Sequence, residues 1–206
     1  MNPSVHTNVL DYGLDYIKQN CNKVIIAKQY AAGDSYATVT TGSNVIAEVT
    51  LTSTDFTLAA GATSNSRKIT SASGKQDASA NNSSQQYTNG TATSGGSTTL
   101  TDSSKSWTVN AYANKAVVIS AGTGSGQHRT IASNTATALT VDTAWTTNPD
   151  ATSVYAVVDD LVIVFLDTVN SRILWTTDET SDQIVTAGNP INFPSVSFTI
   201  AQPTAG

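Results

Sequence analysis

The sequence predicts a mainly β protein: a β-sandwich-like domain with one N-terminal helix and an inserted small β-barrel or sandwich module. Residues 161–166 (LVIVFL) form an uninterrupted apolar run, followed by a turn cluster and a second apolar run. Short apolar or alternating runs recur along the chain, and one segment has helical periodicity. Charged residues make up 12% of the chain, which is about half the usual share. A polar but weakly charged surface is typical of exposed β-structure.

The run at 161–166 is the centre of the predicted host domain. Four of its six residues are β-branched or aromatic, and the polar cluster at 167–171 leads into 172–177 (RILWTT), which predicts a β-hairpin. A strand without polar alternation must be covered on both faces. We therefore expect most other strands to pack over this strand or to pair beside it.

The chain begins with the predicted helix. Leu10, Leu14 and Ile17 recur at helical spacing and give residues 8–20 one apolar face. Strands are expected at 24–27, 45–51, 56–58 and 67–70, of which 45–51 alternates and should have one wet face. Residues 71–89 are a low-complexity run that cannot bury enough apolar surface to fold alone. We expect a linker or surface loop there.

The next block, residues 90–157, has strands of its own. They are expected at 98–100, 116–120, 129–132, 138–141 and 154–157, with turn signals between them. Three aromatic residues supply mass for a small core, namely Trp107, Tyr112 and Trp145. The roughly even spacing predicts a small barrel or sandwich. After the hairpin, an acidic loop at 178–182 leads to expected strands near 184–185 and at 196–200.

Strands of the host type thus lie on both sides of this block. We predict a discontinuous β domain of residues 1–88 and 158–206, with residues 89–157 inserted as an outward-projecting module. Exposed polar loops are the places where a host fold tolerates an insertion. The alternative, two domains in series, would leave the final strands without partners.

Charge and composition exclude several classes of function. The net charge is −5, and no stretch clusters the basic side chains that nucleic-acid binding requires. No segment reaches 18 apolar residues and the first residues lack a secretion signal, so we expect no membrane partner and synthesis in a cytoplasm. Cys21 is the single cysteine, which excludes an intramolecular disulfide and a cysteine-based zinc site.

No catalytic, cofactor-binding or metal-binding residue is predicted. Gly122, Gly124 and Gly126 precede a segment with strand propensity, and no Lys-Ser or Lys-Thr follows, so a turn is favoured over a phosphate loop. A Ser-His-Asp site would have to use His128, but Ser125 does not lie in a G-x-S-x-G elbow. We expect His128 to be an exposed turn residue.

Two groups of side chains leave alternatives open. Asp159 and Asp160, with the acidic residues of 178–182, could supply paired carboxylates for glycan hydrolysis or calcium ligands. Neither set has the spacing of a calcium loop, so solvated loop charge is favoured. The three aromatic residues of the inserted block could stack on sugars, although aromatics in a small β module more often form its core.

Five segments outside the inserted block carry a family pattern: 8–14 (NVLDYGL), 24–26, 67–70, 167–174 (DTVNSRIL) and 186–189. With these residues the chain resembles small virion proteins of tailed bacteriophages, among them head decoration and minor capsid proteins. The inner block is similar to a β module that recurs in phage structural proteins. Its matching residues are 100–103, 106–107, 122–124, 126–127, 129–131 and 148–155.

The resemblance implies a non-enzymatic structural protein at the capsid surface of the virion, synthesised in the host bacterial cytoplasm. Its implied partners are the major capsid protein and further copies of the chain, as a dimer or trimer. No cofactor is implied. One alternative is a tail, baseplate or fibre protein whose inserted module binds a host surface glycan. Another is an enzyme that cleaves cell-wall glycan through the acidic loops.

Overall fold

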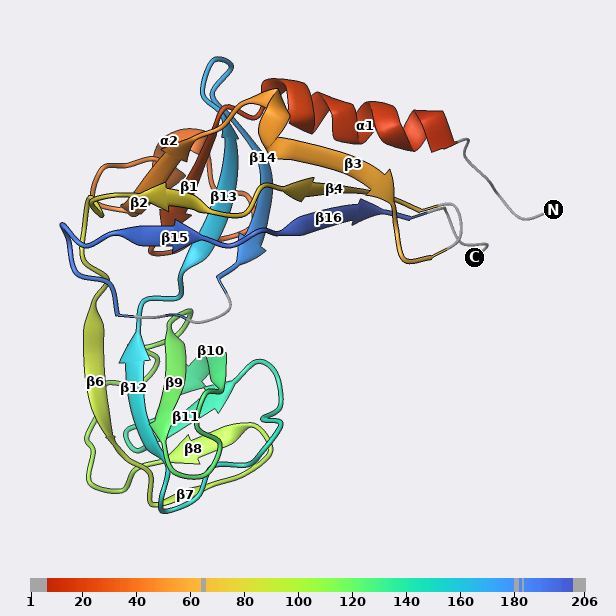
Figure 1. Ribbon diagram of the computed structural model, residues 1–206. Helices are drawn as coiled ribbons and strands as arrows, with labels where there is room; N and C mark the ends of the chain where they lie inside the picture. The colour runs from red at the N-terminus through yellow and green to blue at the C-terminus, as the bar shows by residue number, and fades with distance from the viewer. Residues whose placement is uncertain (1–6, 64–65, 180–181, 183, 202–206) are drawn as a thin grey trace.

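The computed structural model describes residues 7–63, 66–179, 182 and 184–201. The protein is mainly β, with one long helix near the N-terminus and several antiparallel sheets, as the sequence predicts. Figure 1 shows two lobes. We call residues 7–80 and 161–201 the host lobe and residues 86–158 the inserted lobe.

The host lobe is organised around a four-stranded antiparallel sheet. Its strands are β1 (Lys23–Ala27), β2 (Val45–Thr50), β13 (Val162–Asp167) and β14 (Arg172–Asp178), in the order β14-β13-β1-β2. β13 and β14 form the predicted hairpin. Across it the rings of Phe165 and Trp175 stack with their centroids 4.5 Å apart. Because β1 pairs with the other side of β13, the apolar run lies inside the sheet.

β13 buries both of its faces, which confirms the expectation from its uninterrupted apolar run. Ile163 and Phe165 belong to the larger core of the host lobe, together with Leu14 of the N-terminal helix. Val164 and Leu166 belong to a second, smaller core on the opposite face of the sheet. The alternation of side chains along a strand sends neighbouring residues into different cores.

The long helix, α1 (Thr7–Asn20), covers the larger core, and Leu10, Leu14 and Ile17 are buried as predicted. A second helix of one turn, α2 (Tyr36–Val39), was not expected. The side chain of Ser35 caps its N-terminus, and its last residue is buried in the smaller core. No helix within the described ranges has the length and apolar character needed to cross a membrane.

The end of the chain returns to strands that precede the inserted lobe. After the 3₁₀ turn η1 (Ser53–Asp55), β3 (Phe56–Ala60), β4 (Arg67–Ser71) and β16 (Ser197–Ile200) form a sheet in the order β16-β4-β3. β15 (Ile191–Phe193) pairs with β5 (Lys75–Asp77). The final strands therefore pair with strands that precede the inserted lobe in the sequence.

The expected strand near 184–185 is wrong. The backbone N–H of Val185 donates to Ser84 Oγ at 2.7 Å, and the carbonyl of Val185 accepts from the Ser84 N–H at 3.0 Å. These bonds attach the segment to the connection between the lobes, and the strand forms later, at β15.

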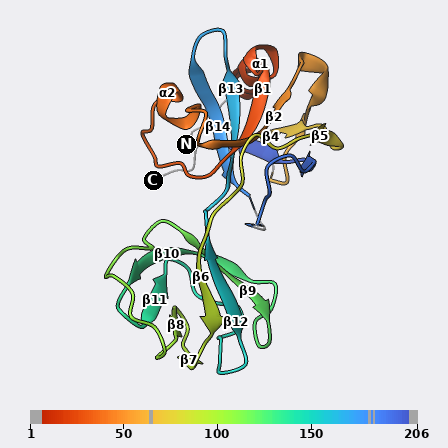
Figure 2. The ribbon, with the colours of Figure 1, turned by 90° about the vertical axis from the view of Figure 1, so that its left-hand side faces the viewer.

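The inserted lobe contains one seven-stranded sheet that curls around its own core (Figures 1 and 2). Its order is β6-β12-β9-β10-β11-β8-β7. The strands are β6 (Gln86–Thr91), β7 (Ser94–Gly95), β8 (Thr99–Thr101), β9 (Ala116–Ala121), β10 (His128–Asn134), β11 (Ala138–Val141) and β12 (Val154–Val158).

The interpretation of residues 71–89 as a loop is wrong in part. β5 and the first four of the six residues of β6 lie within this run. β6 contributes mainly backbone hydrogen bonds to β12 and leaves most of its side chains exposed or half-buried, so its polar composition is compatible with a strand. The expected border between residues 88 and 89 consequently falls inside β6.

A candidate functional site at the junction of the lobes

Two chain segments, residues 81–85 and 159–160, connect the lobes (Figure 2). The host lobe has two apolar cores and the inserted lobe has one, and within the described residues no core contains side chains of both lobes. The relative position of the lobes therefore depends on the connecting segments and on polar contacts beside them.

Asp159 is the centre of the first polar group at the junction. Its side chain is only 2% exposed. One carboxylate oxygen accepts the Gln85 N–H at 2.8 Å. The other accepts the Tyr87 hydroxyl at 2.7 Å and lies 3.3 Å from Lys115 Nζ. Burial lowers the pKa of Lys115, but the contacts with Tyr87 and Asp159 outweigh it and raise that pKa overall.

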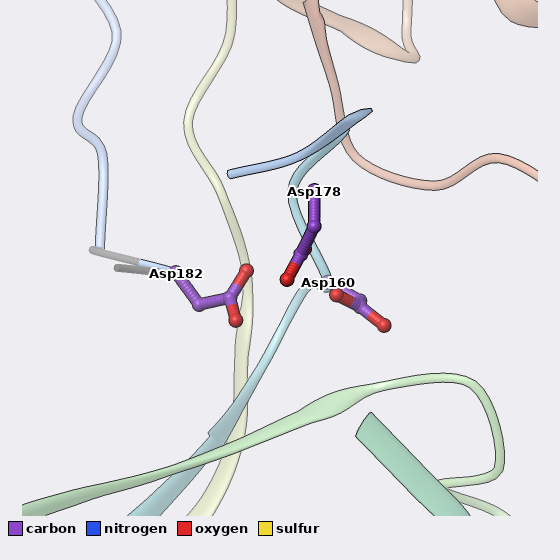
Figure 3. Close-up of side chains that lie close together, drawn as sticks. All are labelled: Asp160, Asp178 and Asp182. Carbon is purple, nitrogen blue, oxygen red and sulfur yellow. The ribbon is translucent and has the colours of Figure 1, made fainter. Parts of the chain in front are cut away.

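Three further aspartates form the second polar group. Figure 3 shows Asp160, Asp178 and Asp182 converging, and one carboxylate oxygen of each lies within 4.8 Å of the others. Asp182 is buried and accepts a hydrogen bond from the Leu161 N–H at 2.8 Å. Its other oxygen lies 2.9 Å from Nδ1 of His128, on β10 of the inserted lobe. We call these four residues, His128 included, the junction cluster.

The electrostatics of the junction cluster follow from its crowding. Desolvation, together with the nearby charge of Asp182, raises the pKa of Asp178 to about 6. Burial also raises the pKa values of Asp160 and Asp182. The hydrogen bond to Asp182 raises the pKa of His128, because it favours the imidazolium.

These positions correct two expectations. His128 is not an exposed turn residue: its side chain is 22% exposed and pairs with Asp182. Asp159 and Asp182 are buried rather than solvated, whereas Asp178 remains exposed. Sequence patterns could not reveal this arrangement, because β10, the connection at 160 and the segment after β14 meet only in the folded chain.

Carboxylate groups are suitable ligands for Ca²⁺ or Mg²⁺. In the junction cluster, however, both oxygens of Asp182 already accept hydrogen bonds or face the imidazole of His128. Asp160, Asp178 and Asp182 could hold a cation only with rearrangement of these contacts. What the observed geometry provides is a titratable connection between the lobes. The expectation that no metal is bound stays a prediction.

The aromatic residues and the glycines of the inserted lobe contribute to its core and to a turn. Trp145 is buried in the core of the inserted lobe, and Trp107 and Tyr112 are half-buried against it, which confirms the core interpretation. The three glycines lie in the turn between β9 and β10 with positive φ, as expected for a turn. Ser125 Oγ donates to the Ser120 carbonyl, and the His128 ring pairs with Asp182, so each of these two residues has another partner.

An exposed surface on α1 was missed by the sequence reasoning. Val9 is 60%, Tyr12 is 77% and Tyr16 is 43% exposed, at the helical spacing i, i+3 and i+7. We call these three residues the α1 face. The signal was present in the sequence, because the helical spacing that places Leu14 in the core places Val9, Tyr12 and Tyr16 away from it, and these residues are apolar or aromatic. Arg172 Nη1 donates to the Tyr16 hydroxyl at 2.5 Å and fixes that end of the row.

No family model matches the chain, and neither the curated proteins nor the solved structures give a match. The function proposed for this chain therefore depends on its own residues and geometry.

Proposed function

We propose that this chain is a non-enzymatic structural protein of a tailed bacteriophage that decorates the outer surface of the capsid. The α1 face and the surrounding host lobe bind the major capsid protein. The inserted lobe extends away from the shell, and copies of the chain associate with one another on the symmetric lattice.

The arrangement of the two ends of the molecule is the observation that carries this proposal. α1 lies at one end of the molecule and the inserted lobe lies at the other, in both views (Figures 1 and 2). A protein bound through α1 would hold its inserted lobe away from the surface beneath it. This is the geometry that a decoration protein with an outward module requires.

The chemistry of the α1 face supports the same proposal. Exposed large apolar and aromatic side chains are unfavourable in water, and when they are grouped they are typical of an interaction surface. Tyrosine contributes a large contact area and a polar hydroxyl, a combination enriched in protein interfaces. The low fraction of charged residues, 12%, reduces the desolvation cost of covering the surrounding surface.

Repetition explains how such a small surface would suffice. One helix face buries less area than a stable isolated complex requires. If copies also contact one another on a shell, each binding event is reinforced by its neighbours, and the total affinity exceeds that of one contact.

Binding to purified capsids that lack the protein tests the proposal. We expect the double variant Val9→Ser, Tyr12→Ser to bind at least about tenfold more weakly in co-sedimentation, since it removes the two most exposed side chains of the α1 face. Val109→Ser is the matched control, because Val109 is 64% exposed but lies in the inserted lobe. Binding of the double variant equal to that of the unmodified protein would contradict the proposal.

A further inference from the structure

A cleft of about 470 Å³ lies between the lobes, and both contribute to its lining. Gln29, Tyr30 and Asp34 come from the host lobe, Asn114 and Thr130 come from the inserted lobe, and Asp160 comes from the connecting segment. The volume falls within the range of small-molecule sites, which occur preferentially at such interfaces. A molecule bound here would contact both lobes at once.

The residues that line the cleft disfavour an anionic ligand. Among the residues that the structure describes, no lysine, arginine or histidine lines the cleft, so an anion would have no basic partner there. The two carboxylates already accept hydrogen bonds from the protein: Asp34 from the Ala31 N–H at 2.8 Å, and Asp160 from Thr130. Their charge is thus partly compensated before any ligand arrives.

The remaining lining favours groups that both donate and accept hydrogen bonds. Gln29 and Asn114 each offer an amide donor and an amide acceptor, and the Thr130 hydroxyl, which donates to Asp160, can still accept a hydrogen bond. Tyr30 is half-buried and packs against the smaller core of the host lobe, which limits the positions its ring can take. An aromatic ring beside several amides and hydroxyls matches a molecule that carries C–H faces and many hydroxyl groups.

We infer that this cleft between the lobes binds an uncharged polyhydroxylated molecule of monosaccharide size. The ligand would connect Gln29 and Tyr30 of the host lobe with Asn114 and Thr130 of the inserted lobe. This site is separate from the α1 face, and it does not depend on capsid binding. It also differs from a sugar-stacking surface on Trp107 and Trp145, because these side chains pack in or against the core of the inserted lobe.

NMR titration of the full-length chain tests the inference. The probes are D-glucose, D-galactose, D-mannose and N-acetyl-D-glucosamine, each raised to about 50 mM, which is well above a Kd of about 1 mM. We expect at least one probe to shift amide signals of the cleft. Gln29→Ala and Thr130→Val should each weaken that binding about fivefold, the effect of one lost hydrogen bond.

Two comparisons make the result specific. Gln19→Ala, an exposed glutamine on α1, is the matched control and should bind as the unmodified chain does. D-Glucosamine and D-glucuronate, the cationic and anionic counterparts, should bind more weakly than the best neutral sugar. The spectra also report whether each variant is folded. If Thr130→Val does not fold, Gln29→Ala still tests the inference, because Gln29 lies in an exposed loop.

Three results would overturn the inference. One is the absence of cleft shifts with all four neutral sugars. Another is unchanged binding in folded Gln29→Ala. The third is tighter binding of D-glucosamine than of any neutral probe, which would indicate a cation site.

Discussion

Nδ1 of His128, on β10, lies 2.9 Å from Oδ2 of Asp182, in the segment that follows β14. The contact joins the inserted lobe to the host lobe, and no apolar core of the described residues does so. A protein whose lobes are held by titratable side chains should change its stability with pH. The pKa shifts within the junction cluster give the direction of this change in stability.

Replacing Asp178 with Asn should stabilise the protein at neutral pH. The folded state raises the pKa of Asp178 from 3.8 to about 6, so the folded chain keeps a proton that the unfolded chain releases between these values. The free energy of unfolding therefore falls as pH rises through this window. We expect Asp178→Asn to gain about 1 kcal/mol at pH 7 and nothing at pH 3, since solvent screens much of the effect at this exposed side chain.

Urea unfolding at pH 3, 5 and 7 measures this difference. Asp15→Asn on α1, outside the junction cluster, is the control. Equal pH curves for Asp178→Asn and the unmodified protein would show that the crowding of the three carboxylates has no energetic consequence.

Replacing His128 with Gln should remove a second pH dependence of the free energy of unfolding, at higher pH than that of Asp178. A raised folded pKa means that protonated His128 stabilises the fold below pH of about 6.5 and that this contribution is lost as pH rises through the folded value. Glutamine can still donate to Asp182 but cannot titrate. We expect a loss of about 1 kcal/mol at pH 5.5 and a smaller loss at pH 8.5, measured by urea unfolding. An equal loss at both pH values would mean that the imidazole acts only through packing.

Gly122→Ala should destabilise the inserted lobe more than Gly126→Ala. Both glycines have positive φ, 77° and 86°, so each substitution carries a backbone cost of about 1–2 kcal/mol. A Cβ at Gly122 would also overlap the carbonyl oxygen of Thr152, whereas a Cβ at Gly126 meets open space. The midpoint temperature of thermal unfolding should therefore be clearly lower for Gly122→Ala than for Gly126→Ala. The reverse order would contradict the packing of this turn.

Two substitutions on α1 should separate folding from binding. Leu14 is fully buried, so Leu14→Ala should lower the free energy of unfolding by about 2–5 kcal/mol. Tyr12 is 77% exposed, so Tyr12→Ala should change it by less than about 0.5 kcal/mol. Capsid binding should nevertheless weaken in folded Tyr12→Ala. A large loss of stability in Tyr12→Ala would show that this side chain belongs to the fold rather than to an interface.

The fold was predictable wherever a long periodic pattern coincided with burial. The apolar run at 161–166 and the spacing of Leu10, Leu14 and Ile17 placed the central strand and the helix correctly, because these patterns directly report which faces are covered. α2 was not predictable in the same way. It has a single turn, its Thr38 and Val39 favour strands, and its packing against the smaller core outweighs that preference.

The junction cluster lay beyond prediction for a different reason. Asp160 lies between two strands, Asp178 ends β14 and Asp182 lies in the segment after it, all places where solvated charges are common. Asp182 is nevertheless buried, and its partner His128 comes from a distant strand of the inserted lobe. Strands β5 and β6 were missed because their side chains are mostly polar, while their backbone groups pair with β15 and β12.

The most direct test of the proposed capsid role is the number of copies in a purified virion, measured by quantitative mass spectrometry against the major capsid protein. Decoration of the head predicts on the order of hundreds of copies in a simple ratio to the shell protein, since each symmetric position binds a copy. A count of about three to a few tens, which is typical of symmetric tail or portal assemblies, would contradict the capsid role.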